Sequence, residues 1–375
     1  MYKNTAVICE TNPFHNGHAC VFHRAKANSG IVTAVMSGNF VQRGLPAVWD
    51  KYTRAALLLE NGADIVVELP YPWSVGSVEN FSLGGVSVAM EMGCDRLMFG
   101  SESGDAEMLR KAAQWLKKEE EQIVSYAVEH PETGAAALYD WLASEGGFSL
   151  SANDKLGMWY LYQMAKLGCQ MAYEAVKRLP AGETVTSAST LREYLADGTD
   201  CTPYVPAAVA EKMRKKPVTL PENFCNIAHT YFRLFAGDTA CAEGDGGLWE
   251  RLKKMAYAAE NGVDFLKSAA TKKYTDARIR RAVLFGMTGI QADMLKLRPC
   301  YTILLAAGEK GREWLRNHPF SEDFTVLTKP ADSSKMSEMA VLQYTFLRKA
   351  DNLYGLCMNP SVSGDFFLKQ HPVIG

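Results

Sequence analysis

The sequence of 375 residues lacks features that would point to several special classes of protein. Its nine cysteines are scattered, with no CxxC pair, which argues against a zinc ribbon or a redox dithiol, and their odd number argues against a full set of disulfides. No run approaches the roughly 20 apolar residues of a membrane-spanning helix. The apolar run at residues 5–9 is too short for the core of a secretory leader. We therefore expect a cytoplasmic protein with no membrane partner.

An excess of one charge is also absent. The chain has 40 Lys and Arg residues against 42 Asp and Glu residues, a formal net charge of −2. This balance excludes a protein that binds polyanions over its whole surface, so a nucleic-acid partner would have to be held by a local basic patch. The hydrophobic content of 47% is that of an ordinary globular protein, and the length is enough for about two or three domains.

Short β-branched runs alternate with helical patterns in the first half of the chain. We expect strands at residues 6–9, 31–36, 65–68, 96–99 and 171–176, with helices at 17–27, 51–60 and 77–92 and a helical region at 105–167. This alternation predicts βαβ units and a parallel sheet that binds ligands at the carboxyl ends of its strands. Residues 197–206 are rich in helix breakers, and helices predominate after them. We predict a Rossmann-like α/β domain at residues 1–198 and a mainly helical domain at 199–375.

The segment NPFHNGH at residues 12–18 lies where the first expected strand passes into the first helix. At this place in a parallel sheet, free backbone N–H groups and the helix dipole favour anions. His15 and His18 add donors for phosphate oxygens, and Gly17 lets a nucleotide approach the backbone. The same residues also fit a helix cap in an exposed loop, or a metal site that includes His23. The alternation of strands and helices behind the segment favours nucleotide binding.

The HxGH motif after the first strand resembles the nucleotidyltransferase superfamily, which includes class I aminoacyl-tRNA synthetases. A longer match is narrower: residues 10–18 (ETNPFHNGH) and 35–44 (VMSGNFVQRG) resemble the bacterial tRNA(Met) cytidine acetate ligase family. The resemblance continues at residues 50–51, 67–70, 99–102, 151–154, 187–192, 272–274 and 278–281. It is dense before Glu102 and sparse after Arg192.

The resemblance implies that ATP and acetate react to give acetyl-adenylate and pyrophosphate. The acetyl group then passes to N4 of the wobble cytidine in elongator methionine tRNA. His15 and His18 are the expected catalytic residues, as donors that stabilise charge on the leaving pyrophosphate. ATP is the expected co-substrate, and Mg²⁺ can accompany it, but we assign no metal ligand in the chain. The expected partners are acetate and the tRNA, with no obligate protein partner.

The residues expected to bind ATP combine the motif with positions further along the chain. They are Ile8, Cys9, Glu10, Thr11, Asn12, Pro13, Phe14, His15, Asn16, Gly17, His18, Ala19, Cys20, Val21, Gly100, Asn153, Arg178, Ser187, Ser189 and Arg192. The segment at 187–192 resembles the second motif of the superfamily, S-x-S/T-x-x-R, and on its own also fits a helix cap. Gly100, Asn153 and Arg178 follow the family, and they otherwise fit a turn, a helix cap and a strand end.

A cluster of basic residues in the second half predicts an RNA-binding surface. The expected tRNA-binding residues are Arg43, Lys267, Lys272, Lys273, Arg278, Arg280 and Arg281. Phosphate contacts from a loop and a helix start are typical of such a surface, although a charge run also fits a solvated face. Arg43 belongs to a long loop at residues 37–44, where the pattern predicts that Asn39 and Gln42 are exposed as well.

Thr11 and the segment at residues 179–183 depart from the family pattern, and three other interpretations stay open. Thr11 stands where the family usually has Tyr, and residues 179–183 replace a segment of the Gly-Tyr-His-Asp kind. The chain therefore also fits a nucleotidyltransferase that acts on a small phosphate ester, or a divergent paralogue with another acyl substrate. A non-catalytic RNA-binding module is a third interpretation, against which the intact His15 and His18 argue.

Overall fold

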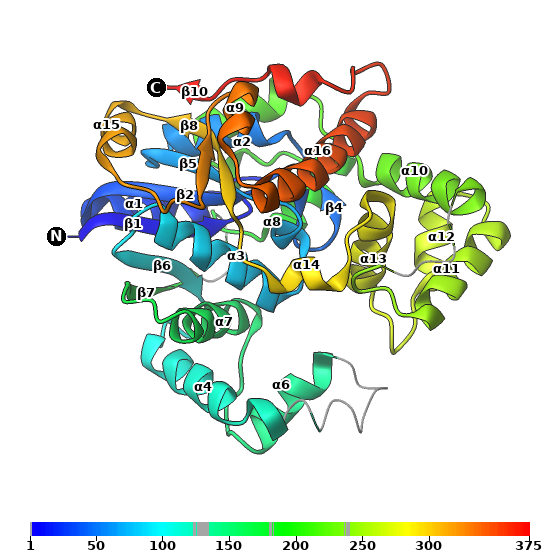
Figure 1. The fold of residues 1–375 in the computed structure, drawn as a ribbon, viewed down its shortest axis with the longest axis horizontal. Helices are drawn as coiled ribbons and strands as arrows, with labels where there is room; N and C mark the ends of the chain where they lie inside the picture. The colour runs from blue at the N-terminus through cyan, green and yellow to red at the C-terminus, as the bar shows by residue number, and fades with distance from the viewer. Residues whose placement is uncertain are drawn as a thin grey trace.

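Five adjacent parallel strands form the larger part of an eight-stranded sheet in the computed structural model (Figure 1). The structure describes residues 2–122, 125, 135–179, 182, 184–235, 237 and 241–375. The order of the parallel strands is β5 (Ile65–Leu69), β2 (Ser29–Ser37), β1 (Tyr2–Cys9), β6 (Arg96–Ser101) and, at the edge, β7 (Ala172–Lys177). These are the five strands that the sequence predicts. Because they run parallel, their carboxyl ends meet at one edge of the sheet.

Helices cover both faces of the sheet, since successive side chains of a strand point to opposite faces. Ile8 belongs to the core of one face and its neighbour Val7 to the core of the other. The first face is covered by α3 (Val78–Glu91), α4 (Ala106–Lys118), α6 (Ala135–Ser144) and α7 (Ala152–Lys166), and the second by α1 (Asn16–Ala27) and α2 (Lys51–Glu60). The α/β architecture of the first half is therefore confirmed.

The C-terminal half adds three strands to the same sheet, and the prediction of a mainly helical region omits them. β8 (Tyr301–Ala307) pairs antiparallel with β5, and β9 (Thr325–Leu327) and β10 (Val373–Ile374) pair with β8. The rest of this half is largely helical, as the sequence predicts. The domain division at residue 198 stays a prediction, and the sheet joins residues from both sides of it.

The remaining elements follow β7 or lie in loops. The helices are α8 (Ala188–Asp197), α9 (Ala207–Lys215), α10 (Pro221–Leu234), α11 (Gly246–Ala258), α12 (Gly262–Ala269), α13 (Asp276–Thr288), α14 (Ala292–Lys296), α15 (Glu309–Asn317) and α16 (Glu338–Met358). Short 3₁₀ turns occur at Trp73–Val75, Thr202–Tyr204, Pro330–Lys335 and Phe366–Lys369. We call α10 to α13 the helical lobe, which projects to one side of the sheet in Figure 1. β3 (Phe40–Val41) and β4 (Leu45–Pro46) form a small hairpin in the expected loop after β2.

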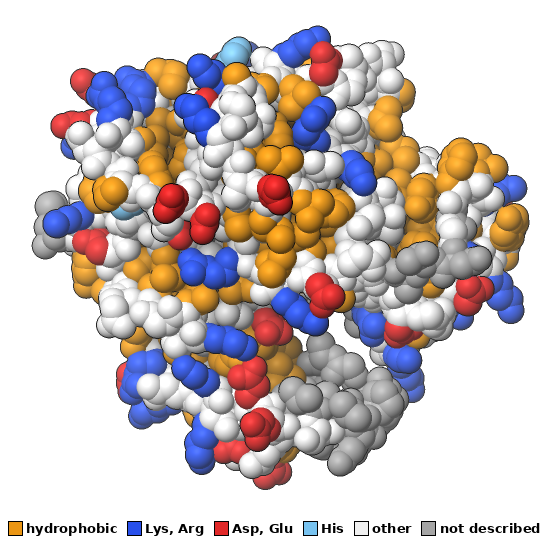
Figure 2. Space-filling model, in the orientation of Figure 1, with side chains coloured by type: hydrophobic (Ala, Val, Ile, Leu, Met, Phe, Trp, Pro, Cys, Tyr) orange, Lys and Arg blue, Asp and Glu red, His pale blue; other side chains and the backbone are white. Residues whose placement is uncertain are grey.

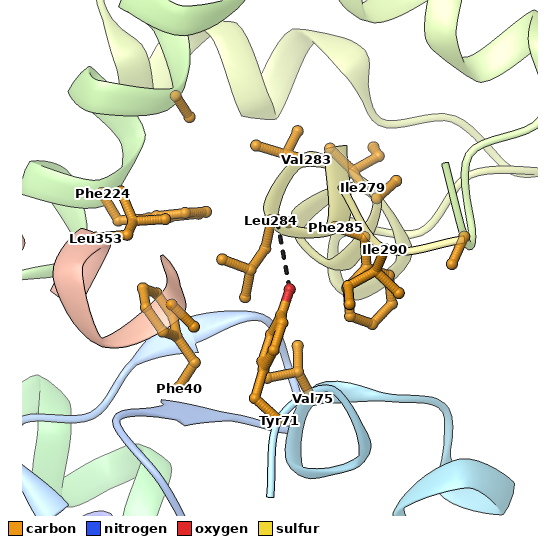
Figure 3. Close-up of a cluster of buried hydrophobic side chains, with 14 of the residues drawn as sticks. Phe40, Tyr71, Val75, Phe224, Ile279, Val283, Leu284, Phe285, Ile290 and Leu353 are labelled. Atoms are coloured by element: carbon orange, nitrogen blue, oxygen red, sulfur yellow. Dashed lines mark hydrogen bonds between the residues drawn. The ribbon is translucent and has the colours of Figure 1, made fainter. Parts of the chain in front are cut away.

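A buried apolar cluster joins the helical lobe to the loops at the carboxyl edge of the sheet (Figure 3). Phe40 of the hairpin packs edge-on against Phe224 of α10, with their ring centroids 5.7 Å apart. Tyr71, which follows β5, lies beneath Leu284 of α13, and its hydroxyl is 2.5 Å from Thr288 Oγ1. The lobe is therefore packed against the same edge at which the parallel strands end.

The surface fits the balanced charge of the sequence. On the face in Figure 2, basic and acidic side chains are interspersed, and apolar side chains gather over α16. No helix in the described part of the chain combines the length and the apolar character needed to cross a membrane.

Candidate active site

A cavity of about 1470 Å³ lies at the carboxyl ends of β1, β6 and β7. Its wall includes Cys9 of β1, Gly100 of β6 and Lys177 of β7, together with the start of α1. The hairpin β3–β4 and residues 218–222, at the start of α10, form another part of the wall. The site is thus where a parallel α/β sheet is expected to bind its ligand.

His15 and His18 lie together at the first turn of α1 and line this cavity, with their ring centroids 3.8 Å apart. The backbone N–H of Gly17 donates to His15 Nδ1 at 3.0 Å, and the N–H of His15 donates to His18 Nδ1 at 3.2 Å. Because each Nδ1 accepts a hydrogen bond from the backbone, each neutral ring carries its own hydrogen on Nε2. Two Nε2–H donors are thus left for a ligand.

Burial holds both rings neutral. Burial and then the charge of Arg178 lower the pKa of His15 to about 4. Burial, His15 and Arg178 together lower the pKa of His18 well below its ordinary value. At neutral pH the pair therefore donates hydrogen bonds without a buried charge of its own. The positive end of the α1 dipole, on which both residues lie, adds to the attraction for an anion.

Most of the predicted ATP-binding residues form the cavity wall. Those on the wall are Ile8, Cys9, Glu10, Asn12, His15, Gly17, His18, Cys20, Val21, Gly100, Asn153, Arg178, Ser187, Ser189 and Arg192. Thr11, Pro13, Phe14, Asn16 and Ala19 are not part of it. Thr11 is fully buried with φ at 47°, and its hydroxyl contacts Met36 Sδ at 3.4 Å. Asn16 donates to the carbonyls of Thr184 and Pro203. These residues therefore contribute to the packing of the loop and of α1 rather than to the cavity wall.

The predicted second motif touches the first. Ser187 caps α8 by accepting a hydrogen bond from the N–H of Thr190. Arg192 Nη1 donates to the carbonyl of Asn12 at 2.7 Å, and its Nη2 donates to Ser189 Oγ at 3.0 Å. The helix cap and a ligand-facing role are therefore compatible, because the cap places Arg192 against the loop between β1 and α1.

Gly100, Asn153 and Arg178 meet at the end of the cavity beside β6 and β7. Asn153 Nδ2 donates to Glu102 Oε1 at 2.5 Å, and the N–H of Asn153 donates to Glu102 Oε2 at 3.0 Å. A Cβ at position 100 would meet Arg178 Cγ at 3.6 Å, an ordinary contact distance, so Gly100 and Arg178 lie next to each other at this end of the cavity. Glu102 lines the cavity but is absent from the predicted site residues; its hydrogen bonds to Asn153 depend on tertiary contact.

The basic residues predicted to bind tRNA occupy different environments. Arg43 lines the cavity at the hairpin tip, and its carbonyl accepts a hydrogen bond from Arg280 Nε at 3.0 Å. Gly44, with φ at 72°, packs so closely on α13 that a Cβ would lie 2.8 Å from the Arg281 nitrogen. The hairpin tip is therefore joined directly to the start of α13.

Acidic neighbours pair with part of the basic cluster. Arg278 Nη2 lies 3.1 Å from Asp245 Oδ2, and Arg281 Nη2 lies 3.0 Å from Glu243 Oε2. Lys273 is 3.9 Å from the same Asp245 oxygen. Lys267 and Lys272 are exposed on the lobe. The basic cluster thus lies on one lobe, where acidic side chains form ion pairs with two of its arginines, Arg278 and Arg281.

Asn39 is buried, contrary to the prediction of an exposed side chain. It is 2% exposed, its Nδ2 donates to Asp351 Oδ1 at 2.9 Å, and its Oδ1 accepts from the N–H of Lys51 at 2.8 Å. Lys51 Nζ in turn lies 2.7 Å from Asp351 Oδ2 and 2.7 Å from Glu68 Oε2. The partner Asp351 is 312 positions away in sequence, so no local pattern could have indicated this burial.

A parallel sheet with an HxGH pair at the start of its first helix and a cavity above it defines a nucleotidyltransferase. The family model for "HIGH Nucleotidyl Transferase" matches residues 2–366. The chain is 32% identical over 357 residues to the tRNA(Met) cytidine acetate ligase of Anoxybacillus flavithermus, covering 84% of this chain and 86% of that protein. It is 29% identical to the Acetivibrio thermocellus ligase of the same name, covering 96% of each. The chain belongs to the tRNA(Met) cytidine acetate ligase family.

A solved structure extends the similarity to the whole fold. The crystal structure of Thermotoga maritima TmcAL bound with alpha-thio ATP matches with a TM-score of 0.89 and 28% sequence identity. The match covers 99% of each chain, so it includes the helical lobe and the strands of the C-terminal half.

Proposed function

We propose that this protein is an ATP-dependent ligase that activates acetate as acetyl-adenylate and transfers the acetyl group to N4 of the wobble cytidine of elongator tRNA(Met). The observation that carries the proposal is the pair of neutral rings, His15 and His18, whose Nε2–H groups are left for a ligand in the cavity. Relatives named for this activity, one of them solved with an ATP analogue, support the substrate assignment.

The cavity offers distinct places for the parts of ATP. The phosphates belong at the start of α1, between His15 and His18 on one side and Arg192 on the other, where donors and the helix dipole attract anions. The base and ribose then extend towards Gly100 and Asn153. Acetate attacks the α-phosphorus, and the two imidazole donors stabilise the negative charge that builds up on the departing pyrophosphate.

Any metal ion in the reaction is expected to arrive with the nucleotide. Among the described residues, no group of three or more His, Cys, Asp or Glu side chains is arranged to hold a metal ion. Phosphate oxygens are ligands that Mg²⁺ prefers, and such an ion would neutralise part of the triphosphate charge.

The tRNA is expected to enter past the hairpin. This part of the cavity wall consists of residues 41–43, 45–46 and 218–222, and Arg43 within it is bonded to the helical lobe. Exposed Lys267 and Lys272 on that lobe suit the phosphate backbone, whereas the cavity receives the single nucleotide that reacts.

The first test measures acetate-dependent exchange of pyrophosphate into ATP by the purified protein. We expect exchange with acetate, and a gain of one acetyl group on tRNA(Met) by mass spectrometry. His18→Ala should lower the exchange rate by roughly 10²–10³-fold, as loss of one donor to a developing charge does elsewhere. Exchange with another carboxylate in place of acetate would contradict the substrate, and no exchange with any carboxylate would contradict the activity.

A further inference from the structure

Glu10 connects two parts of the cavity wall, the loop after β1 and the hairpin β3–β4. It directly follows β1 and precedes the loop that carries His15, so it borders the place assigned to the phosphates. Its Oε1 accepts a hydrogen bond from the N–H of Gln42 at 2.7 Å, which ties it to the hairpin past which the tRNA is proposed to enter. A group at this position borders both the proposed phosphate site and the proposed path of the acceptor nucleotide.

One carboxylate oxygen of Glu10 is left for a ligand. In the described part of the chain, Oε1 is bonded to Gln42, whereas Oε2 has no hydrogen-bond partner. Burial raises the pKa of Glu10, and the backbone N–H of Gln42 and the charges of Arg192, Arg43 and Arg54 act in the opposite direction. The half-buried side chain therefore combines a raised pKa with an open oxygen.

Two other polar groups near Glu10 also lack partners. Gln42 Nε2 and the hydroxyl of Tyr160 are buried, and neither has a hydrogen-bond partner within the part of the chain that the structure describes. Both residues line the cavity, and the Tyr160 hydroxyl is near enough to Glu10 and Cys9 for their charges to affect its pKa. A buried polar group without a hydrogen-bond partner costs free energy, so these groups suit a polar ligand bound beside Glu10.

We propose that Glu10 is a further catalytic residue, whose Oε2 accepts the proton lost by the exocyclic amine of the acceptor cytidine. The nitrogen attacks the carbonyl carbon of acetyl-adenylate, a C–N bond forms, and the bond from that carbon to the phosphate oxygen breaks. AMP leaves with the electron pair, and the amine proton passes to Glu10 and then to solvent. The inference rests on the proposed function and assigns its second step to a residue other than His15 and His18.

The variant Glu10→Gln tests this step separately from the first. Its amide oxygen can still accept the Gln42 N–H, so the fold and the hairpin should be retained. We expect single-turnover acetyl transfer to tRNA(Met) to fall by roughly 10²–10⁴-fold, the range for loss of a general base, and this loss to exceed any loss of acetate-dependent ATP–pyrophosphate exchange. Wild-type transfer should slow as pH falls through the pKa of Glu10, and the variant should lose this dependence.

The matched control is Glu313→Gln, which makes the same chemical change in an exposed carboxylate on α15, outside the residues that line the cavity. Both reactions should be unchanged in it. Normal transfer by Glu10→Gln, or an equal loss of exchange and transfer, would overturn the role of Glu10 while leaving the proposed function intact. A wild-type protein without acetate-dependent exchange would overturn the proposed function itself, and the inference with it.

Discussion

At the scale of the residue, the hydrogen bonds that form the start of α1 also determine which nitrogen of His15 and of His18 can donate to a ligand. His15 caps α1 with Nδ1, and His18 uses Nδ1 to accept the N–H of His15. A helix cap normally satisfies backbone donors and has no further effect. Here it also fixes the tautomer, because a ring that accepts at Nδ1 donates at Nε2. The helix-cap and nucleotide-binding interpretations of the motif are therefore compatible.

The lowered pKa of His15 predicts how stability changes in acid. The ordinary pKa of 6.5 holds in the unfolded chain, and the pKa is about 4 in the folded one. Between these values the unfolded chain binds the proton more readily, so the free energy of unfolding falls as pH falls. In His15→Asn the side-chain oxygen still caps α1 but does not titrate. We expect the variant to lose roughly 1–3 kcal/mol less than wild type between pH 6.5 and pH 4.5.

Urea unfolding at a series of pH values measures this difference. His371→Asn is the control, since His371 is exposed, and its pH profile should match that of the wild type. An unchanged pH profile in His15→Asn would show that His15 titrates normally in the folded chain.

At the scale of the elements, a buried ionic cluster joins three parts of the fold. Lys51 of α2, Glu68 of β5 and Asp351 of α16 meet where Lys51 is 1% exposed. Glu68 Oε1 is buried without a partner among the described residues, and burial raises the pKa of Glu68 to about 7 against the opposing charge of Lys51. The single ammonium group of Lys51 thus pairs with the carboxylates of both Glu68 and Asp351.

Lys51→Met should therefore destabilise the protein by roughly 3–5 kcal/mol, the cost of leaving a buried charge without its partner. Urea unfolding at pH 7.5 measures it. Lys215→Met is the control, because Lys215 pairs with Glu211 on the surface of α9 and exposed pairs contribute at most about 1 kcal/mol. A destabilisation by Lys51→Met no larger than that of the control would mean that the cluster does not stabilise the fold.

The sequence predicted the elements that local pattern determines. β1, β2, β5, β6 and β7 are apolar runs followed by helices, so their existence and their parallel direction could be inferred, whereas their order in the sheet was not predicted. β8 also lies in an apolar run, residues 301–307, but helices surround it in sequence. Its place depends on antiparallel pairing with β5, more than 230 positions earlier, and local pattern carries no information about such a partner.

The candidate site also combines residues that local pattern predicts with residues that only tertiary contacts reveal. The HxGH pair and the 187–192 motif lie at helix starts that the sequence marks, so their positions were predicted. Glu102 and the open oxygen of Glu10 could not be predicted, because their environments depend on hydrogen bonds to residues of other elements. Asn39 was predicted to be exposed because its side chain is polar. Its hydrogen bond to Asp351 satisfies that polarity and makes burial possible.

At the scale of the whole molecule, the lobe and the cavity are linked through the hairpin. Phe40 is packed into the lobe core, and Arg43 is bonded to α13 while it lines the cavity. The net charge of −2 does not oppose tRNA binding, because a local basic patch can hold the phosphates. Glu243 and Asp245 form ion pairs with Arg281 and Arg278, so fewer positive charges are left for RNA than the cluster of six basic residues at 267–281 suggests. Lys267 and Lys272 are among the exposed ones.

These two lysines should therefore affect tRNA binding without affecting the chemistry. In the double variant Lys267→Gln and Lys272→Gln, tRNA affinity should fall, and the slope of log affinity against log salt should become shallower by up to about 0.9 for each phosphate that is no longer neutralised. ATP–pyrophosphate exchange, which needs no tRNA, should stay at the wild-type rate. The matched control replaces Lys111 and Lys310, which are exposed on α4 and α15, away from the lobe in Figure 1. Equal decreases in affinity in both double variants would indicate a non-specific effect of charge, because only a binding surface on the lobe makes the position of the lysines matter.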